Sequence, residues 1–119
     1  MKNVESPRPS TVLLVETHSP SDSLDSDDFL RFADSLLRTG SAVHLHLMQN
    51  GVLWVQRGTA SLTRIKQVFG KQVKVTCDDV SLDLRGIPHT ESAPHADTIG
   101  VDQLVELMVD PSIKTIWHS

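Results

Sequence analysis

The chain has 119 residues, a single cysteine, 4% aromatic residues and a formal net charge of −4. That length suits one domain whose core is large enough to fold without a metal ion or a disulfide. The negative charge and the scarce aromatic side chains disfavour direct nucleic-acid binding, and the sequence shows no pattern of a membrane span or signal peptide, so we expect a cytoplasmic protein with no membrane contact.

The predicted elements begin after a polar segment. Residues 1–10 contain two prolines and little apolar surface, so we expect a flexible tail ahead of a single domain over residues 11–119. Residues 11–15 (TVLLV) form a continuous apolar, β-branched run, which is typical of a strand covered on both faces. The domain is therefore predicted to start with a buried strand.

A helix and a second strand follow. Apolar residues recur at helical spacing over residues 29–37, residues 26–28 supply an N-cap and first-turn acids, and Gly40 is placed to end the helix. Residues 42–48 alternate partly in polarity, as a strand does. The Asn-Gly pair at residues 50–51 then favours a tight turn.

The central part of the chain continues this alternation. A short helical piece is predicted over residues 52–55, and a longer helix over residues 61–69, with Ser61 as its cap. A third strand is predicted over residues 72–76, and a helical pattern over residues 78–85 follows it directly.

The last third begins with an irregular segment. Residues 87–98 contain two prolines and two histidines and are predicted to form a loop, followed by a minimal strand over residues 99–101. Asp102 is placed to cap a final helix, and residues 113–117 form the last predicted strand.

Strands that alternate with helices imply right-handed crossovers and parallel pairing. The sequence therefore predicts a small three-layer α/β domain of the flavodoxin-like or Rossmann-like type, with a mostly parallel sheet of four to five strands. In such folds, ligands bind at the carboxyl ends of the strands.

Polar side chains follow three of the predicted strands. His18 follows the first strand, Gln49 and Asn50 follow the second, and Asp78 follows the third, with Arg85 at the end of the next helix. We expect these residues to line one crevice, because the carboxyl ends of parallel strands meet at one edge. His18 is a candidate acid or base there, and the amides of Gln49 and Asn50 could orient a ligand, although turn geometry accounts equally well for Asn50.

The only cysteine lies at the third strand end. Cys77 stands between the apolar strand and the helix start, where backbone N–H groups favour a thiolate. Asp78 and Asp79 oppose its ionisation, whereas Lys74 and Arg85 would favour it. Two interpretations stay open: a reactive thiol that acts as nucleophile or group carrier, and a small buried apolar residue.

No metal or cofactor is predicted. His44 and His46 share one face of a strand, as two metal ligands would, but no third ligand is evident. A nucleotide or flavin would be suggested by fold analogy alone, since no glycine-rich phosphate loop follows any strand.

Four segments resemble a known family. They are residues 47–54 (LMQNGVLW), residues 73–87 with their Arg-Gly ending, residues 18–20 (HSP) and residues 101–117 with their final Trp. In order and spacing they resemble the DsrE/DsrF/DsrH-like family of small sulfur-relay proteins, most closely its DsrH/TusB-like branch. The resemblance covers most of the chain.

The resemblance implies cytosolic sulfur handling in one of two ways. In catalytic members, a cysteine near the position of Cys77 carries persulfide in sulfur oxidation or tRNA thiolation, which would make Cys77 a catalytic residue of a sulfurtransferase or sulfur carrier. His18, from its place at a strand end, is the second candidate catalytic residue. Members of the DsrH/TusB-like branch act instead as subunits of mixed hexamers without an essential thiol. The alternative is therefore a non-catalytic subunit, or a module that binds a small ligand or a partner.

The resemblance also implies partners. We expect an oligomer with other DsrE/F/H-type subunits or with further copies of this chain, and contact with sulfur donor and acceptor proteins. Trp54 and Trp117 could either complete the core or form an exposed apolar patch, and the resemblance favours a subunit interface.

Overall fold

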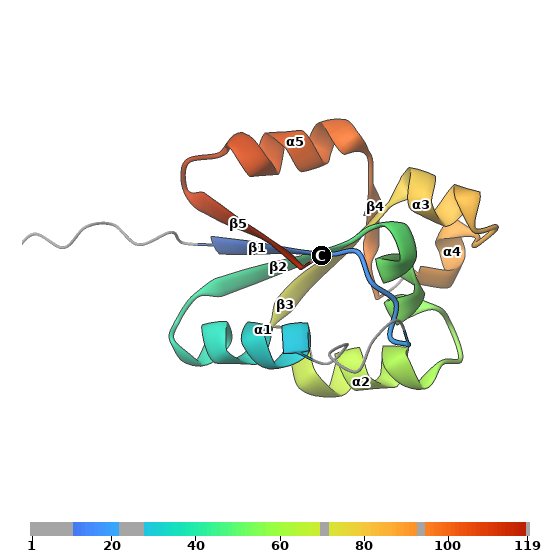
Figure 1. Cartoon of the computed structure of the whole chain (residues 1–119), viewed down its shortest axis with the longest axis horizontal. Helices are drawn as coiled ribbons and strands as arrows, with labels where there is room; N and C mark the ends of the chain where they lie inside the picture. The colour runs from blue at the N-terminus through green and yellow to red at the C-terminus, as the bar shows by residue number, and fades with distance from the viewer. Residues whose placement is uncertain (1–10, 22–27, 70–71, 93–94, 119) are drawn as a thin grey trace, which may run out of the picture.

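Within residues 11–21, 28–69, 72–92 and 95–118, which the computed structural model describes, five strands form one parallel sheet (Figure 1). The strands are β1 (Thr11–Glu16), β2 (Ala42–Leu47), β3 (Val73–Asp78), β4 (Asp97–Ile99) and β5 (Ile113–His118), arranged in the order β4-β3-β2-β1-β5. Every pairing between neighbours is parallel, so the predicted fold class is confirmed.

Helices cover both faces of the sheet. They are α1 (Asp28–Arg38), the 3₁₀-helix η1 (Gln49–Val55), α2 (Ala60–Phe69), α3 (Asp79–Leu84), α4 (His89–Ser92) and α5 (Val101–Val109). In Figure 1, α1 and α2 lie below the sheet, α5 lies above it, and α3 and α4 lie at the end where β3 stops. None of the helices in the described part of the chain is long and apolar enough to cross a membrane.

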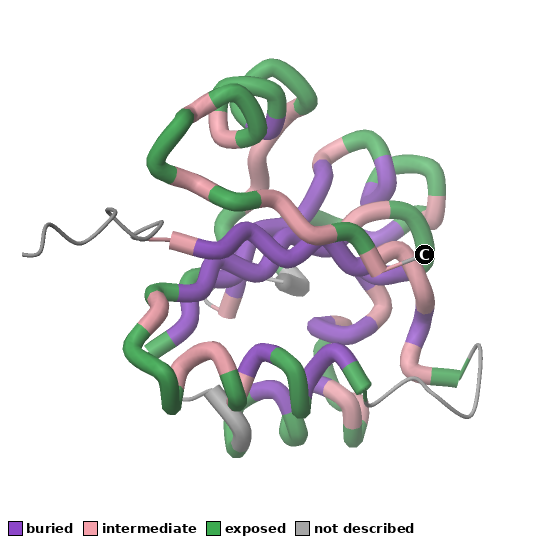
Figure 2. Tube along the Cα trace, turned by 60° about the vertical axis from the view of Figure 1, so that its left-hand side comes forward, coloured by how far each residue is buried: buried purple, intermediate pink, exposed green. Residues whose placement is uncertain are grey.

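The core is divided unequally by the sheet. Alternate residues of β1, Val12 and Leu14, belong to a large buried cluster with the inner residues of α1, α2 and η1. Leu13 and Val15 point to the other face, where they form a small cluster with Leu104 of α5. Figure 2 shows the same difference, because the central strands are buried while much of α5 is exposed.

The strand order reverses between β1 and β5. The chain adds β2, β3 and β4 outward from β1, then returns across the sheet through α5 and places β5 on the free side of β1. In open α/β sheets, such a switch point leaves a crevice at the carboxyl ends of the two strands. Here those ends are Glu16 and His118, which are partners in the β1–β5 register.

Glycine is required at two positions for different structural reasons. Gly40 has a φ of +93° and ends α1 as predicted, with its N–H and that of Ser41 bonded to the carbonyls of Leu37 and Leu36. Gly51, by contrast, closes a turn at the start of η1, because its N–H donates to the carbonyl of Met48 at 2.9 Å, as the Asn-Gly pair predicted. A Cβ at Gly51 would meet the carbonyl oxygen of Glu16 at 2.1 Å, so glycine is needed there for close approach to β1.

Several predicted boundaries are wrong by one or two residues. β4 comprises Asp97–Ile99 rather than residues 99–101, and α5 begins at Val101 with Gly100 as its N-cap in place of Asp102. Thr59, not Ser61, caps α2, because its Oγ1 accepts the N–H of Leu62 at 3.3 Å.

Two further predictions concern the segment before β4 and the residues ahead of β1 and α1. The predicted loop over residues 87–98 contains the short helix α4. The predicted tail over residues 1–10 and the cap over residues 26–27 lie outside the described residues.

Candidate functional site

The structure places Cys77 inside the core. β3 runs two residues further than predicted, to Asp78, so Cys77 is a strand residue and joins Val73 and Val75 in the large buried cluster. The residue is 0% exposed, and burial, with a smaller contribution from the charge of Asp78, raises the pKa of its thiol to about 12. The expectation that this sulfur is presented to solvent is therefore wrong.

The two cations expected to favour ionisation of Cys77 do not stabilise its thiolate. Lys74 and Cys77 point to opposite faces of the sheet, because they are three residues apart on β3. Lys74 lines a cavity on the α5 side together with His44 and Thr76. Arg85 is engaged elsewhere, because its guanidinium bonds Asn50. The buried thiol thus has no compensating positive charge from either residue.

The crevice residues at β2 and β3 do come together, but they bond one another. Asp78 Oδ2 accepts the N–H and the hydroxyl of Ser81 at 2.9 and 2.6 Å, and the Ser81 hydroxyl accepts the N–H of Gln49 at 2.7 Å. Asn50 Oδ1 accepts two hydrogen bonds from Arg85, at 3.0 and 2.8 Å. These contacts tie η1 to the start and end of α3.

Gln49 is the one described non-glycine residue with a positive φ, of 53°. Its backbone turns the chain from β2 into η1, and its N–H is held by Ser81. The strained backbone is therefore supported by the same hydrogen bonds that tie η1 to α3. Asn50 contributes to that contact through its side chain, and it also lies within the turn that the hydrogen bond from Gly51 to Met48 closes.

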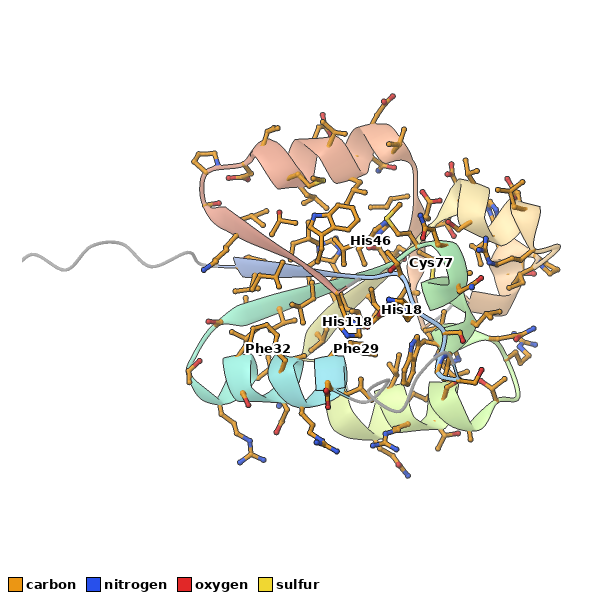
Figure 3. All side chains as sticks on the ribbon, in the orientation of Figure 1. His18, Phe29, Phe32, His46, Cys77 and His118 are labelled. Atoms are coloured by element: carbon orange, nitrogen blue, oxygen red, sulfur yellow. The ribbon has the colours of Figure 1, made fainter. Side chains whose placement is uncertain are left out.

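A further polar cluster lies at the switch point. Glu16 is 1% exposed; its Oε2 accepts the backbone N–H of His18 at 2.8 Å, and its Oε1 lies 2.6 Å from Nδ1 of His118. The rings of His18 and His118 meet edge to face with centroids 5.4 Å apart, and the ring of Phe29 is stacked near His118. Figure 3 shows His18, His118 and Phe29 gathered on the α1 side of the sheet.

The electrostatics of this cluster are dominated by burial. Loss of solvation raises the pKa of Glu16, while the hydrogen bond from His18 and the charge of His118 act in the opposite direction. The buried carboxylate at Nδ1 of His118 fixes the orientation of the imidazole ring. The switch point therefore holds a carboxylate and an imidazole in direct contact.

Sequence reasoning included His18 but missed its partner. His118 was expected to lie beyond the last strand, whereas β5 extends to include it and pairs it with Glu16. The signal that could have identified it is the strand order, because a final strand placed beside β1 brings residues 16 and 118 to the same level.

The two strand histidines form a buried hydrogen-bonded group on the α5 side of the sheet. His44 Nε2 and His46 Nδ1 each lie 2.8 Å from the hydroxyl of Thr76. Burial lowers the pKa of each imidazole to about 4, so both rings are neutral near pH 7. Among the residues that the structure describes, no group of three or more histidine, cysteine or acidic side chains is arranged to hold a metal ion.

The two tryptophans differ in exposure. Trp54 is buried in the core, where its ring meets Phe29 edge to face at 4.8 Å and its Nε1 donates to the carbonyl of His18 at 3.0 Å. It cannot form part of a subunit interface in this fold, so that expectation is wrong. Trp117 is 46% exposed and stays a candidate.

Neither a family model nor a curated protein matches the sequence. Solved structures do match the fold. The ychN protein from E. coli superposes with a TM-score of 0.74 at 19% identity, over 90% of this chain and 99% of its own. MTH1491 from Methanobacterium thermoautotrophicum, a protein of unknown function, superposes with a TM-score of 0.71 at 14% identity, over 91% of this chain and 97% of its own. At these identities the matches show a shared fold.

Proposed function

We propose that this chain is a non-catalytic, cytosolic subunit of a DsrE/DsrF/DsrH-type assembly. It supports sulfur transfer by holding partner proteins, and it does not carry persulfide itself. The observation that carries this proposal is the burial of Cys77, whose sulfur has no access to solvent.

The chemistry of sulfur transfer explains why burial matters. The thiolate, not the thiol, accepts sulfur, and with a pKa of about 12 only about one Cys77 side chain in 10⁵ is ionised at about pH 7. Ionisation would also place a negative charge next to Asp78 in the core. Cys77 therefore acts as a small core residue.

The remaining support comes from the fold and the sequence. The α/β fold shared with ychN and MTH1491 is of the class that the sequence resemblance implies. The segments at residues 47–54 and 101–117 resemble the branch whose members act without an essential thiol. Both observations agree with a subunit that assembles but does not carry sulfur.

Intact-mass measurement after incubation with a persulfide donor tests the proposal. We expect no gain of one sulfur mass in the native chain, and a gain once the chain is unfolded in denaturant, because unfolding exposes Cys77. The variant Cys77→Ala is the matched control for sulfur added at any other group. Rapid addition to the native wild-type chain, absent from this variant, would show that the chain carries persulfide.

The assembly part is tested separately by native mass spectrometry. The chain is mixed with DsrE-type and DsrF-type subunits that carry the persulfide cysteine. We expect a mixed oligomer that contains this chain. If the chain stays apart from these subunits under conditions in which they assemble with their own third subunit, the proposed role as an assembly subunit is wrong.

A further inference from the structure

The outer side of α5 carries an apolar row that the described part of the chain does not cover. The residues Val101, Val105, Met108 and Val109, which we call the α5 stripe, are all exposed, with Val101 at 61% and Val109 at 72%. Their spacing of four, seven and eight residues places them along one side of the helix. Leu104 faces the sheet instead and packs on β1. A helix that met only solvent on this side would be expected to carry polar residues there.

Trp117 extends the apolar surface beyond the helix. It pairs in register with Val15, whose side chain lies in the cluster beneath α5, so Trp117 belongs to the same face of the sheet. β5 is the edge strand on that side among the described strands, and α5 packs on it. The α5 stripe and Trp117 therefore belong to one edge of the molecule.

A row of negative charge runs beside the stripe. Asp102, Glu106 and Asp110 follow one another at intervals of four residues, and α5 contains no lysine, arginine or histidine. Asp102 and Glu106 are both exposed. Lys74 of β3 lines the cavity that Glu106 and Asp110 also line, so the surface combines an apolar row with three acidic residues and one nearby cation.

This charge pattern decides which occupant fits. Two antiparallel copies of α5 packed about a two-fold axis would set their acidic rows against each other, which is unfavourable, and two parallel copies would leave each acidic row without a cation opposite it. Elsewhere in the described residues, the exposed large apolar side chains are Phe32, Val80 and Leu84, divided between α1 and α3. The described part of a second copy therefore offers no other helix with such an exposed apolar row.

We infer that the α5 stripe docks an amphipathic helix of a different protein, whose apolar row is flanked by lysine or arginine. The inference rests on the proposed function and names the chemistry of the partner that the subunit holds. Because α5 is only nine residues long, about 13.5 Å at 1.5 Å per residue, this contact alone is expected to be small and reversible.

Two synthetic peptides test the charge requirement on the full-length chain. Both form helices with the same row of leucines; one has lysines beside the row and the other has glutamates. Fluorescence anisotropy of the labelled peptides should show about tenfold tighter binding of the lysine peptide, a preference that falls as salt is added. Equal binding of the two peptides, or binding of neither, would overturn the inference.

Matched variants locate the binding surface. Val105→Asp adds a negative charge, so it should tighten binding of the lysine peptide if charge alone decides the affinity. It should weaken binding more than tenfold if the apolar row is the docking surface, as we expect. Leu84→Asp makes a similar change on exposed α3 and should leave binding unchanged. Glu106→Lys should reduce the preference for the lysine peptide. Circular dichroism would verify that the variants are folded.

Two results would point to other occupants or other surfaces. If the chain alone forms a dimer that Val105→Asp dissociates, the occupant is a second copy and the inference is wrong. If Val105→Asp and Leu84→Asp weaken peptide binding equally, the α5 stripe is not the docking surface.

The inference and the proposed function can fail separately. Sulfur uptake by native Cys77 would disprove the non-catalytic role and leave the peptide result intact. Conversely, a mixed oligomer that forms equally well with the Val105→Asp variant would keep the proposed function and remove the α5 stripe from the interface.

Discussion

At the carboxyl end of β1, the surroundings of Glu16 show how a single buried charge is accommodated. Removing a carboxylate from water is costly, and the cost is offset only where other groups satisfy its oxygens. Here one oxygen accepts the N–H of His18 and the other faces Nδ1 of His118. The partners come from positions 18 and 118, so the pair joins the first strand to the last.

The pKa of Glu16 should depend on His118. In the variant His118→Gln the nearby positive charge is lost while burial is retained, so the pKa of Glu16 should rise further above its ordinary value. Carbon-13 NMR titration of the side-chain carboxyl measures this shift. The matched variant His89→Gln alters a histidine that pairs with Asp83, and should leave Glu16 unchanged. An unaltered or lowered pKa in His118→Gln would contradict the prediction.

At the scale of elements, η1 is the piece that organises the carboxyl edge. It packs against the end of β1 through Gly51 and against α3 through the hydrogen bonds of Gln49 and Asn50. Its position therefore depends on close backbone contact at one end and on side-chain bonds at the other.

Gly51→Ala should be destabilising and should disturb the switch-point cluster. The new Cβ would overlap the carbonyl of Glu16, so the backbone of β1 or η1 must move, at a cost of about 1–3 kcal/mol of unfolding free energy. Denaturant unfolding gives the cost, and the NMR shifts of Glu16 report the movement. Gly86→Ala is the matched control: it strains a φ of +66° but meets open space, so Glu16 should be unaffected. A Glu16 signal that stays in place in Gly51→Ala would refute the close-contact explanation.

Asp78 should matter as a helix cap more than as a charge. Asp78→Ala removes the acceptor for the N–H of Ser81 and should cost about 1–2 kcal/mol of unfolding free energy, whereas Asp78→Asn keeps an acceptor and should cost much less. Urea denaturation of both variants provides the measurement. If the two variants lost the same stability, charge and not capping would be the dominant contribution.

For the molecule as a whole, the two faces of the sheet have different chemistry. The face toward α1 and α2 contains the large apolar cluster with Cys77 and, at the carboxyl end of β1, the Glu16–His118 pair, while the face toward α5 contains the His44–Thr76–His46 group. Figure 3 shows His46 on the α5 side. Nε2 of His46 is buried without a hydrogen-bond partner among the described residues, so a charged form there would be poorly tolerated.

Stability should therefore fall as pH decreases from about 6.5 toward 4. Between these values His46 is protonated in the unfolded chain but neutral in the folded one, so acid favours unfolding; the shift from 6.5 to about 4 corresponds to about 3 kcal/mol. His44 acts in the same direction. Glu16, whose pKa is raised in the folded state, acts in the opposite direction and offsets part of the effect.

Urea unfolding at a series of pH values measures this dependence. The variant His46→Gln should show a weaker pH dependence in the same window, because one titrating imidazole is removed. Identical profiles in the wild type and His46→Gln would show that His46 does not control acid stability.

Local sequence patterns were sufficient to predict the fold class. The alternation of strand and helix patterns determined a parallel α/β sheet, and Gly40 was correctly predicted to end α1, because both depend on residues close together in the chain. The same reasoning placed Gln49, Asn50, Asp78 and Arg85 near one another, since parallel strands end at a common edge.

Only the tertiary structure decided which of the candidate side chains are exposed to solvent and which contact one another. Cys77 could be assigned to the buried face only once β3 was known to extend past it, because alternation between the two faces holds only within a strand. Periodicity defines the end of a strand only to within a residue or two. The sequence left the exposure of Trp54 equally open, and the structure buries its ring against Phe29 in the core. The pairing of Glu16 with His118 depended on the return of β5 to the side of β1, because contacts between residues so distant in sequence follow from strand order and not from local pattern.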